Sequence, residues 1–149
     1  NGSAPAAAGG ITLSWPTSSQ NVSYGFHDPD YPFADLFQHE GIDITVSQGT
    51  AVKAAGTGTV SAVYNGGANG ASFVMIAHEG GLTTVYGHLS TIYVNINDTV
   101  TSDTVIGLSG GTPGTPGAGE YTNGAHLHFE IRLNGAAVDP IQYLANTSA

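Results

Sequence analysis

The chain has 149 residues, which is enough for one domain with its own hydrophobic core. Its 11 acidic residues stand against 2 Lys and Arg, and the formal net charge of -9 argues against nucleic acid or an anionic membrane surface as the main partner. The sequence contains no Cys, which excludes disulfides and thiolate metal ligands and leaves His, Asp and Glu to bind any metal.

The distribution of residue types predicts an all-β protein. The sequence has 22 Gly and 7 Pro, and Thr, Val, Ile and Tyr recur in short runs between turn residues. No long stretch repeats apolar residues at helical spacing, so we expect very little helix beyond single turns at 33–37 and 139–144. No apolar run reaches transmembrane length, so we expect no membrane insertion. The predicted strands cover residues 22–26, 42–46, 51–54, 57–64, 72–78, 82–88, 126–133 and 136–138.

The two ends of the chain differ in composition from the rest. Residues 1–10 are rich in Ala, Gly and Ser and predict a flexible N-terminal tail, and residues 146–149 predict a short flexible C-terminal tail. We therefore expect one folded domain over residues 11–145, and we expect it to be a monomer.

The first candidate functional segment is His39-Glu40-Gly41-Ile42-Asp43. On a straight strand, His39 and Asp43 would lie roughly 13 Å apart, too far to share one ion. A turn at Gly41 can fold His39 back over the start of the strand that carries Asp43. We expect Glu40 to face the solvent in that arrangement.

The second candidate segment is His126-Leu127-His128-Phe129-Glu130, in the apolar and polar alternation of a half-buried strand. Side chains two apart on a strand point the same way, so His126, His128 and Glu130 should share one face. Two imidazoles and a carboxylate together suit a divalent metal or proton transfer. The spacing alone leaves other readings open, since the two histidines can be cross-strand polar partners or can both bind the same ion.

Three loops are expected to form the walls of a groove around these side chains. The irregular segment 110–124 ends directly before His126, and a loop of this length inside a compact domain is more often functional than decorative. Residues 24–38 and 65–70 form the other expected walls. A further histidine, His88, ends the strand predicted over residues 82–88.

Taken together, these segments resemble the M23 family of zinc metallopeptidases, the lysostaphin-type or LytM-like peptidoglycan endopeptidases. The resemblance extends from about Trp15 to Leu144, and it implies a duplicated-hybrid-motif-like fold in which an antiparallel sheet carries an open groove. It also implies an active enzyme that is exported and works outside the cell, in the periplasm or in the cell envelope. The residues that carry the resemblance include His39-Glu40-Gly41-Ile42-Asp43-Ile44, Thr84-Val85-Tyr86-Gly87-His88-Leu89, Gly124-Ala125-His126-Leu127-His128-Phe129-Glu130 and Val138-Asp139-Pro140.

The resemblance implies a role for each residue of the motif. His39, Asp43 and His128 bind one zinc ion, and His88 and His126 are the catalytic histidines beside it. This division leaves the fourth zinc position to water or substrate. Either catalytic histidine can accept a proton from the attacking water, and a protonated one can stabilise the oxyanion or donate to the leaving amine. The implied reaction is zinc-dependent hydrolysis of amide bonds in the peptide cross-links or stems of bacterial peptidoglycan.

Other residues near the motif are candidates for supporting roles. Glu130 shares the strand face of the histidines and can fix the tautomer of an imidazole. Tyr86, Tyr121 and Asn123 are candidates for hydrogen bonds to a substrate peptide. His27 and His78 fall outside the motif and are expected to be structural or surface residues. The residues before the His-x-His pair, Tyr121-Thr122-Asn123-Gly124-Ala125, depart from the usual family pattern, so the loop shape and the substrate can differ.

Two other classes of function are compatible with parts of the pattern. A non-catalytic cell-wall binding or amidase-activating module would share the fold without needing an intact site. A cupin-type metal enzyme also uses a His-x-His pair, but it draws its last histidine from a later strand, and here no histidine follows His128. The sequence also leaves open which bond is cut: a glycine-rich cross-bridge, a D-amino-acid cross-link or the stem.

Overall fold

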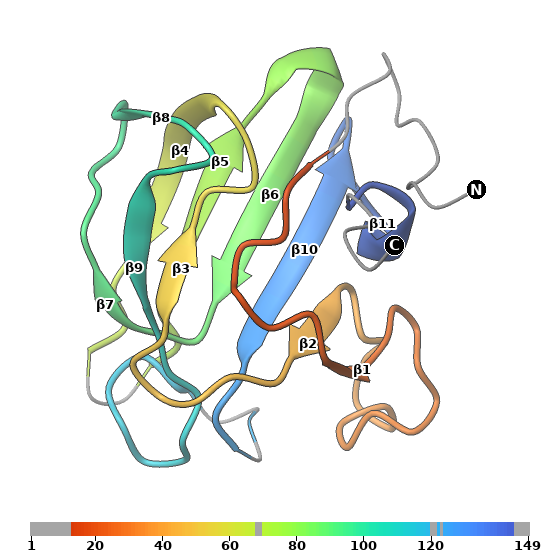
Figure 1. The fold of residues 1–149 in the computed structure, drawn as a ribbon. Helices are drawn as coiled ribbons and strands as arrows, with labels where there is room; N and C mark the ends of the chain where they lie inside the picture. The colour runs from red at the N-terminus through yellow and green to blue at the C-terminus, as the bar shows by residue number, and fades with distance from the viewer. Residues whose placement is uncertain (1–12, 68–69, 120–121, 123, 145–149) are drawn as a thin grey trace.

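The structure, a computed structural model, describes residues 13–67, 70–119, 122 and 124–144, so the predicted tails lie outside the described residues (Figure 1). In this part of the chain nearly all regular structure is β-strand, which confirms the all-β prediction. None of its helical segments has the length and hydrophobicity needed to cross a membrane. The strands are β1 (Val22–Tyr24), β2 (Ile42–Ile44), β3 (Ala51–Lys53), β4 (Gly58–Tyr64), β5 (Phe73–Ala77), β6 (Leu82–Gly87), β7 (Leu89–Ile92), β8 (Thr99–Val100), β9 (Val105–Ser109), β10 (Leu127–Leu133) and β11 (Ala136–Val138).

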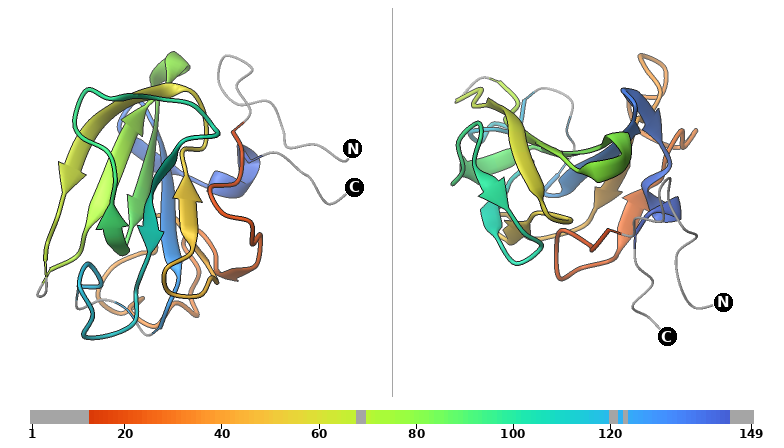
Figure 2. Two further views of the ribbon diagram at one scale, coloured as in Figure 1. Left: turned by 60° about the vertical axis from the view of Figure 1, so that its left-hand side comes forward. Right: turned by 90° about the horizontal axis from the view of Figure 1, so that it is seen from above.

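These strands form two antiparallel sheets with a shared hydrophobic core. The larger sheet has the order β1-β2-β10-β6-β5-β4-β8, with β11 also paired to β10. The smaller sheet has the order β3-β9-β7 and forms a second layer beside the larger one (Figures 1 and 2). Buried side chains of both sheets belong to one cluster, with Val52 and Ile106 from the smaller sheet and Val74 and Phe129 from the larger. The smaller sheet thus covers apolar surface that the larger sheet would otherwise expose to water.

β10 carries two of the candidate site residues, His128 and Glu130, and it begins directly after a third, His126. It lies between β2 and β6 in the larger sheet. Leu127, Phe129 and Ile131 are fully buried in the core, and each contributes about 1.5 to 3 kcal/mol through burial. Because side chains alternate along a strand, His128 and Glu130 project from the opposite face. One alternating sequence therefore supplies both the core and the polar face of the site.

The hairpins predicted from turn residues are present. The short 3-10 segment η2 (Glu79–Gly81) joins β5 to β6, and the turn at Asn134 and Gly135 joins β10 to β11. A second 3-10 segment, η3 (Pro140–Gln142), supplies the helical turn expected at 139–144. Glycine is needed at position 135, because its φ of 90° lies in the left-handed region.

The strand predicted over residues 82–88 ends one residue earlier than expected. β6 stops at Gly87, and His88 has a left-handed backbone with φ of 62°. The next residue, Leu89, begins β7 in the smaller sheet, so the chain crosses between the sheets at His88. A left-handed backbone costs a residue other than glycine on the order of 1 to 3 kcal/mol, which the surrounding structure must offset.

Tyr86 is part of the core, so the prediction that it binds substrate is wrong. Its side chain is completely buried. The hydroxyl accepts a hydrogen bond from the Ala55 backbone N–H at 2.9 Å and contacts the Thr84 hydroxyl at 2.6 Å. The Thr84 hydroxyl in turn lies 2.8 Å from Nε2 of His78, which supports a structural role for that histidine. Tyr86 therefore ties β6 to the segment that follows β3.

We expect Tyr86→Phe to lower the free energy of unfolding by about 1 to 3 kcal/mol, because it leaves the buried Ala55 N–H without its acceptor. Chemical denaturation measures this change. Tyr93→Phe is the matched control, since Tyr93 is 56% exposed, and it should change the same quantity by less than about 0.5 kcal/mol. Equal stabilities of the two variants would contradict the core role of the Tyr86 hydroxyl.

Candidate metal centre

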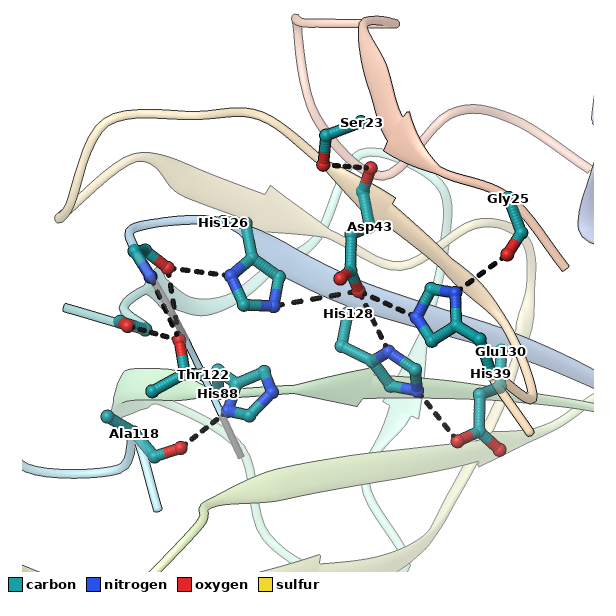
Figure 3. Close-up of polar contacts among 12 residues, drawn as sticks. Ser23, Gly25, His39, Asp43, His88, Ala118, Thr122, His126, His128 and Glu130 are labelled. Carbon is teal, nitrogen blue, oxygen red and sulfur yellow. Dashed lines mark hydrogen bonds and ion pairs between the residues drawn. The ribbon is translucent and has the colours of Figure 1, made fainter. Parts of the chain in front are cut away.

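The centre is built on one cross-strand pair of the larger sheet. Asp43 in β2 lies directly opposite His128 in β10. Oδ1 of Asp43 is 3.0 Å from Nδ1 of His128, and Asp43 is only 4% exposed. A buried carboxylate requires compensating partners. Figure 3 shows that imidazoles surround this carboxylate.

His39 reaches the same carboxylate from the segment before β2. Its Nε2 lies 3.0 Å from Oδ1 of Asp43, which confirms the expected fold-back of the chain at Gly41. Gly41 packs directly against β10, where any Cβ would collide with the carbonyl oxygen of Phe129. The His39 ring is held by a hydrogen bond from Nδ1 to the Gly25 carbonyl at 2.7 Å. Glu40, which lies between His39 and Gly41 in the sequence, is exposed to solvent as expected.

The charge of Asp43 is stabilised by these neighbours. Burial by itself would raise the pKa of the Asp43 carboxyl, but the hydrogen bonds from His128 and His39 outweigh it and hold the pKa well below its usual range. The carboxylate therefore stays ionised at neutral pH, as a metal ligand must.

The geometry of these residues fits a zinc ion. The candidate ligand atoms of His39, Asp43 and His128 all lie within 4.8 Å of one another. Zinc binds nitrogen and oxygen at about 2.0 to 2.2 Å, so tetrahedral ligands lie about 3.3 Å apart, close to the 3.0 Å separations of both histidine nitrogens from Asp43. Two imidazoles and one carboxylate are also a common zinc donor set. Within the described residues, this trio is the group that meets the geometric requirement for a metal site.

His126 and His88 lie beside this trio, and their rings are 4.7 Å apart between centroids. Nδ1 of His126 is 2.7 Å from the Gly124 carbonyl, and Nδ1 of His88 is 2.6 Å from the Ala118 carbonyl. Because a carbonyl only accepts, Nδ1 must carry the proton in both rings, which leaves Nε2 as the basic nitrogen when the ring is neutral. Nε2 of His126 lies 3.5 Å from Oδ1 of Asp43 (Figure 3).

The environment of His88 favours its neutral form. Burial lowers the pKa of His88, the nearby rings of His126 and His128 lower it further, and together they bring it to about 4. At neutral pH this imidazole is therefore able to accept a proton. His88 has a left-handed backbone, and its ring meets the Ala118 carbonyl and lies beside the ring of His126.

A second carboxylate supports the far side of His128. Nε2 of His128 lies 2.8 Å from Oε2 of Glu130, and Oε1 of Glu130 accepts two hydrogen bonds from Arg132. Burial disfavours protonation of His128, but the hydrogen bonds to Asp43 and Glu130 outweigh it and raise the pKa of His128 to about 9. Glu130 is thus placed to accept the Nε2 proton and leave Nδ1 to a metal.

Two hollows open onto the centre and share His88, His128 and Glu130 in their linings. The first, of about 330 Å³, runs over β5, β6 and β10 toward Arg132. The second, of about 220 Å³, is bounded by the 31–40 segment, which confirms part of the expected wall at 24–38. The centre therefore lies at the junction of two arms of one groove.

The outcome differs among the remaining residues named in the sequence analysis. Tyr121 and Asn123 lie outside the described residues. His27 is half exposed and lies 3.3 Å from Glu40, which fits the surface role expected for it. Two features of the centre are not predicted by the sequence: the ring of Tyr31, which stacks on His39 at 4.1 Å between centroids, and the backbone carbonyls that orient the histidines. No sequence pattern signals which carbonyl an imidazole will meet.

Comparison with known proteins gives an independent result. Peptidase family M23 matches residues 37–140 of the chain. An uncharacterized metalloprotease of Haemophilus influenzae is 42% identical over 104 residues, which are 69% of this chain and 20% of that protein. The DD-carboxypeptidase/endopeptidase Mpg of Neisseria meningitidis is 39% identical over 103 residues, which are 69% of this chain and 22% of that protein. The chain thus spans about a fifth of the length of these relatives.

A solved structure shares the fold. The crystal structure of a zinc containing peptidase from Vibrio cholerae superimposes with a TM-score of 0.73 at 26% identity. The match covers 87% of this chain and 39% of that chain. This chain therefore shares its fold with part of a zinc containing peptidase.

In the metal-free protein we expect His128 to be protonated at pH 7 and His88 to be neutral, because their pKa values are about 9 and about 4. The raised pKa means that the charged His128 stabilises the metal-free fold below its ordinary pKa near 6.5 and that this contribution is lost as the pH rises through 9. Zinc must displace the His128 proton, so its apparent affinity should rise up to about tenfold per pH unit until pH 9. Histidine NMR titration and calorimetry measure both effects, and a metal-free His128 that titrates at or below pH 6.5 would contradict them.

Proposed function

The chain belongs to peptidase family M23, and we propose that it is a zinc-dependent endopeptidase that hydrolyses amide bonds in the peptide cross-links or stems of bacterial peptidoglycan. The observation that carries the proposal is the convergence of His39, Asp43 and His128 on one buried point, with His88 and His126 on one side of it. A peptidase of this kind needs three ligands, an open position and a proton acceptor, and these five side chains can supply them.

The proposed ligands are Nε2 of His39, Oδ1 of Asp43 and Nδ1 of His128. A zinc ion held there would supply Lewis-acid activation of water and of the scissile carbonyl. Gly25 and Glu130 keep the outer nitrogens of the two ligand rings engaged, so each ring presents a fixed nitrogen to the centre. Such preorientation reduces the entropy lost when the site is filled.

The proposed catalytic groups are His88 and His126. Hydrogen bonds from Nδ1 to backbone carbonyls hold both rings, so that Nε2 is the nitrogen that takes or gives a proton. The low pKa keeps His88 neutral at pH 7, so its Nε2 is free to accept a proton, and once protonated the ring can stabilise the developing oxyanion or donate to the leaving amine. The distance of 4.7 Å between the rings allows both to contact one reacting group.

The shape of the groove and the relatives support the proposed substrate class. A groove with two arms that meet at the proposed zinc site accommodates a peptide extending on both sides of the cleaved bond, which favours an endopeptidase. The name of the Neisseria relative, DD-carboxypeptidase/endopeptidase, supports a peptide of the cell wall. Because that substrate lies outside the cytoplasm, we propose that the protein works in the cell envelope or beyond it.

A non-catalytic wall-binding or amidase-activating module of the same fold is the alternative. Such a module does not need the ligand and proton-transfer residues to be complete. Here all five positions are occupied by residues of the required type and are brought together. The proposal of an active enzyme rests on that completeness.

We expect His39→Ala and Asp43→Ala to abolish bound zinc and cleavage of muropeptides together, because each removes a ligand. We expect His88→Ala and His126→Ala to keep zinc and to lose about 10²- to 10⁴-fold in kcat, because each removes a proton-transfer group. Metal analysis and mass spectrometry of released peptides measure the two properties. His27→Ala is the control, because it removes an exposed imidazole outside the centre.

Full cleavage by His39→Ala or Asp43→Ala would refute the proposed ligand set. Loss of zinc from His126→Ala would show that both histidines of the pair bind the ion. Failure of the wild-type, zinc-loaded protein to release peptides from any peptidoglycan would favour the non-catalytic alternative.

A further inference from the structure

The arm of the groove that runs over β5, β6 and β10 has an apolar floor and a cationic end. Phe73, Met75 and Val85 line it between the proposed zinc site and Arg132. Arg132 is one of only two Lys and Arg residues in the whole sequence, and the other, Lys53, lies in β3 of the smaller sheet. In a chain with a net charge of -9, a guanidinium at the end of this arm favours the binding of an anion there.

Arg132 is accessible to a ligand, and its hydrogen bonds to Glu130 occupy only part of its guanidinium group. Its side chain is 38% exposed. Glu130 accepts hydrogen bonds from Nε at 3.0 Å and from Nη2 at 2.8 Å, and both go to the same oxygen, Oε1. The guanidinium has five N–H donors, so these two bonds leave donors for a ligand. The other oxygen of Glu130 faces His128, which shares the carboxylate charge between two partners.

The opposite arm has the reverse character. Besides Glu130 and the histidines of the centre, it is lined by Tyr31, Phe37, Gln38 and Glu40, and none of these four is a cation. Glu40 is exposed and lies at this end of the groove, so a substrate carboxylate would be repelled there. The two arms therefore differ in charge, so a substrate with a carboxylate on one side of the cleaved bond is expected to bind in one orientation.

From this arrangement we infer that Arg132 binds a carboxylate of the substrate peptide in the Phe73, Met75 and Val85 arm, and so selects peptides that carry a free carboxyl group near the cleaved bond. The apolar floor between the proposed zinc site and Arg132 suits small or apolar side chains of the substrate peptide. His128 and Arg132 are four residues apart on β10, about 13 Å between Cα atoms. An extended peptide covers about 3.3 Å per residue, so the carboxylate belongs within about four residues of the cleaved bond. This inference rests on the proposed function and names its substrate class.

The test uses two synthetic cross-linked muropeptides that differ only in whether the carboxyl groups of the stem are free or amidated. The zinc-loaded wild-type protein should cleave the free acid with a kcat/KM about tenfold higher than the amide, mainly through a lower KM. Arg132→Gln should lose about tenfold more on the free acid than on the amide, because any effect of its lost hydrogen bonds to Glu130 is the same for both substrates. Arg132→Lys should retain part of the preference, and Lys53→Gln should behave like the wild type.

The two substrates distinguish a role of Arg132 in binding the substrate carboxylate from a role in positioning Glu130. If Arg132 only holds Glu130 against His128, Arg132→Gln will lower the rate on both substrates equally, and the inference is then wrong. A wild-type protein that cleaves both substrates equally well also overturns it. A wild-type protein that cleaves neither, with zinc bound, overturns the proposed function and this inference with it.

Discussion

The contact between the buried carboxylate of Asp43 and the imidazoles of His39 and His128 is the interaction on which the rest of the site depends. A carboxylate that is 4% exposed is costly unless it is neutralised by its surroundings. Here both imidazole nitrogens lie 3.0 Å away, and they come from the segment before β2 and from β10. The chain therefore places the ligand atoms of three metal-binding side chains within 4.8 Å of one another, so that one ion there could bond to all three.

The sheet register is what makes this contact possible. Asp43 and His128 are paired across β2 and β10, and the alternate residues Leu127 and Phe129 are locked in the core. A slip of one residue would turn the apolar side chains outward and the site residues inward, so core packing fixes the site geometry. The smaller sheet contributes from the other side, because the crossing from β6 to β7 places His88.

Much of the arrangement could be predicted from the sequence because it is local. The alternation from His126 to Glu130 predicted one face of β10, and Gly41 predicted the fold-back that brings His39 to Asp43. Other features depend on partners far along the chain, such as the Ala118 carbonyl 30 residues from His88 and the Ala55 N–H 31 residues from Tyr86. The substrate contact predicted for Tyr86 is wrong for this reason, since a tyrosine in an alternating strand gives no sign of whether its hydroxyl meets substrate or backbone. The distinction between ligand and catalytic histidines came from the family resemblance, because the spacing of two residues fits both roles.

The most direct measurement is the structure of the zinc-loaded protein, with the metal located by anomalous diffraction at the zinc edge. The account predicts one ion within about 2.0 to 2.2 Å of Nε2 of His39, an oxygen of Asp43 and Nδ1 of His128. It also predicts that Nε2 of His88 and Nε2 of His126 remain outside bonding distance and face the open side of the ion. An ion bound to His126, or coordination of His128 through Nε2 with Glu130 displaced, would contradict it.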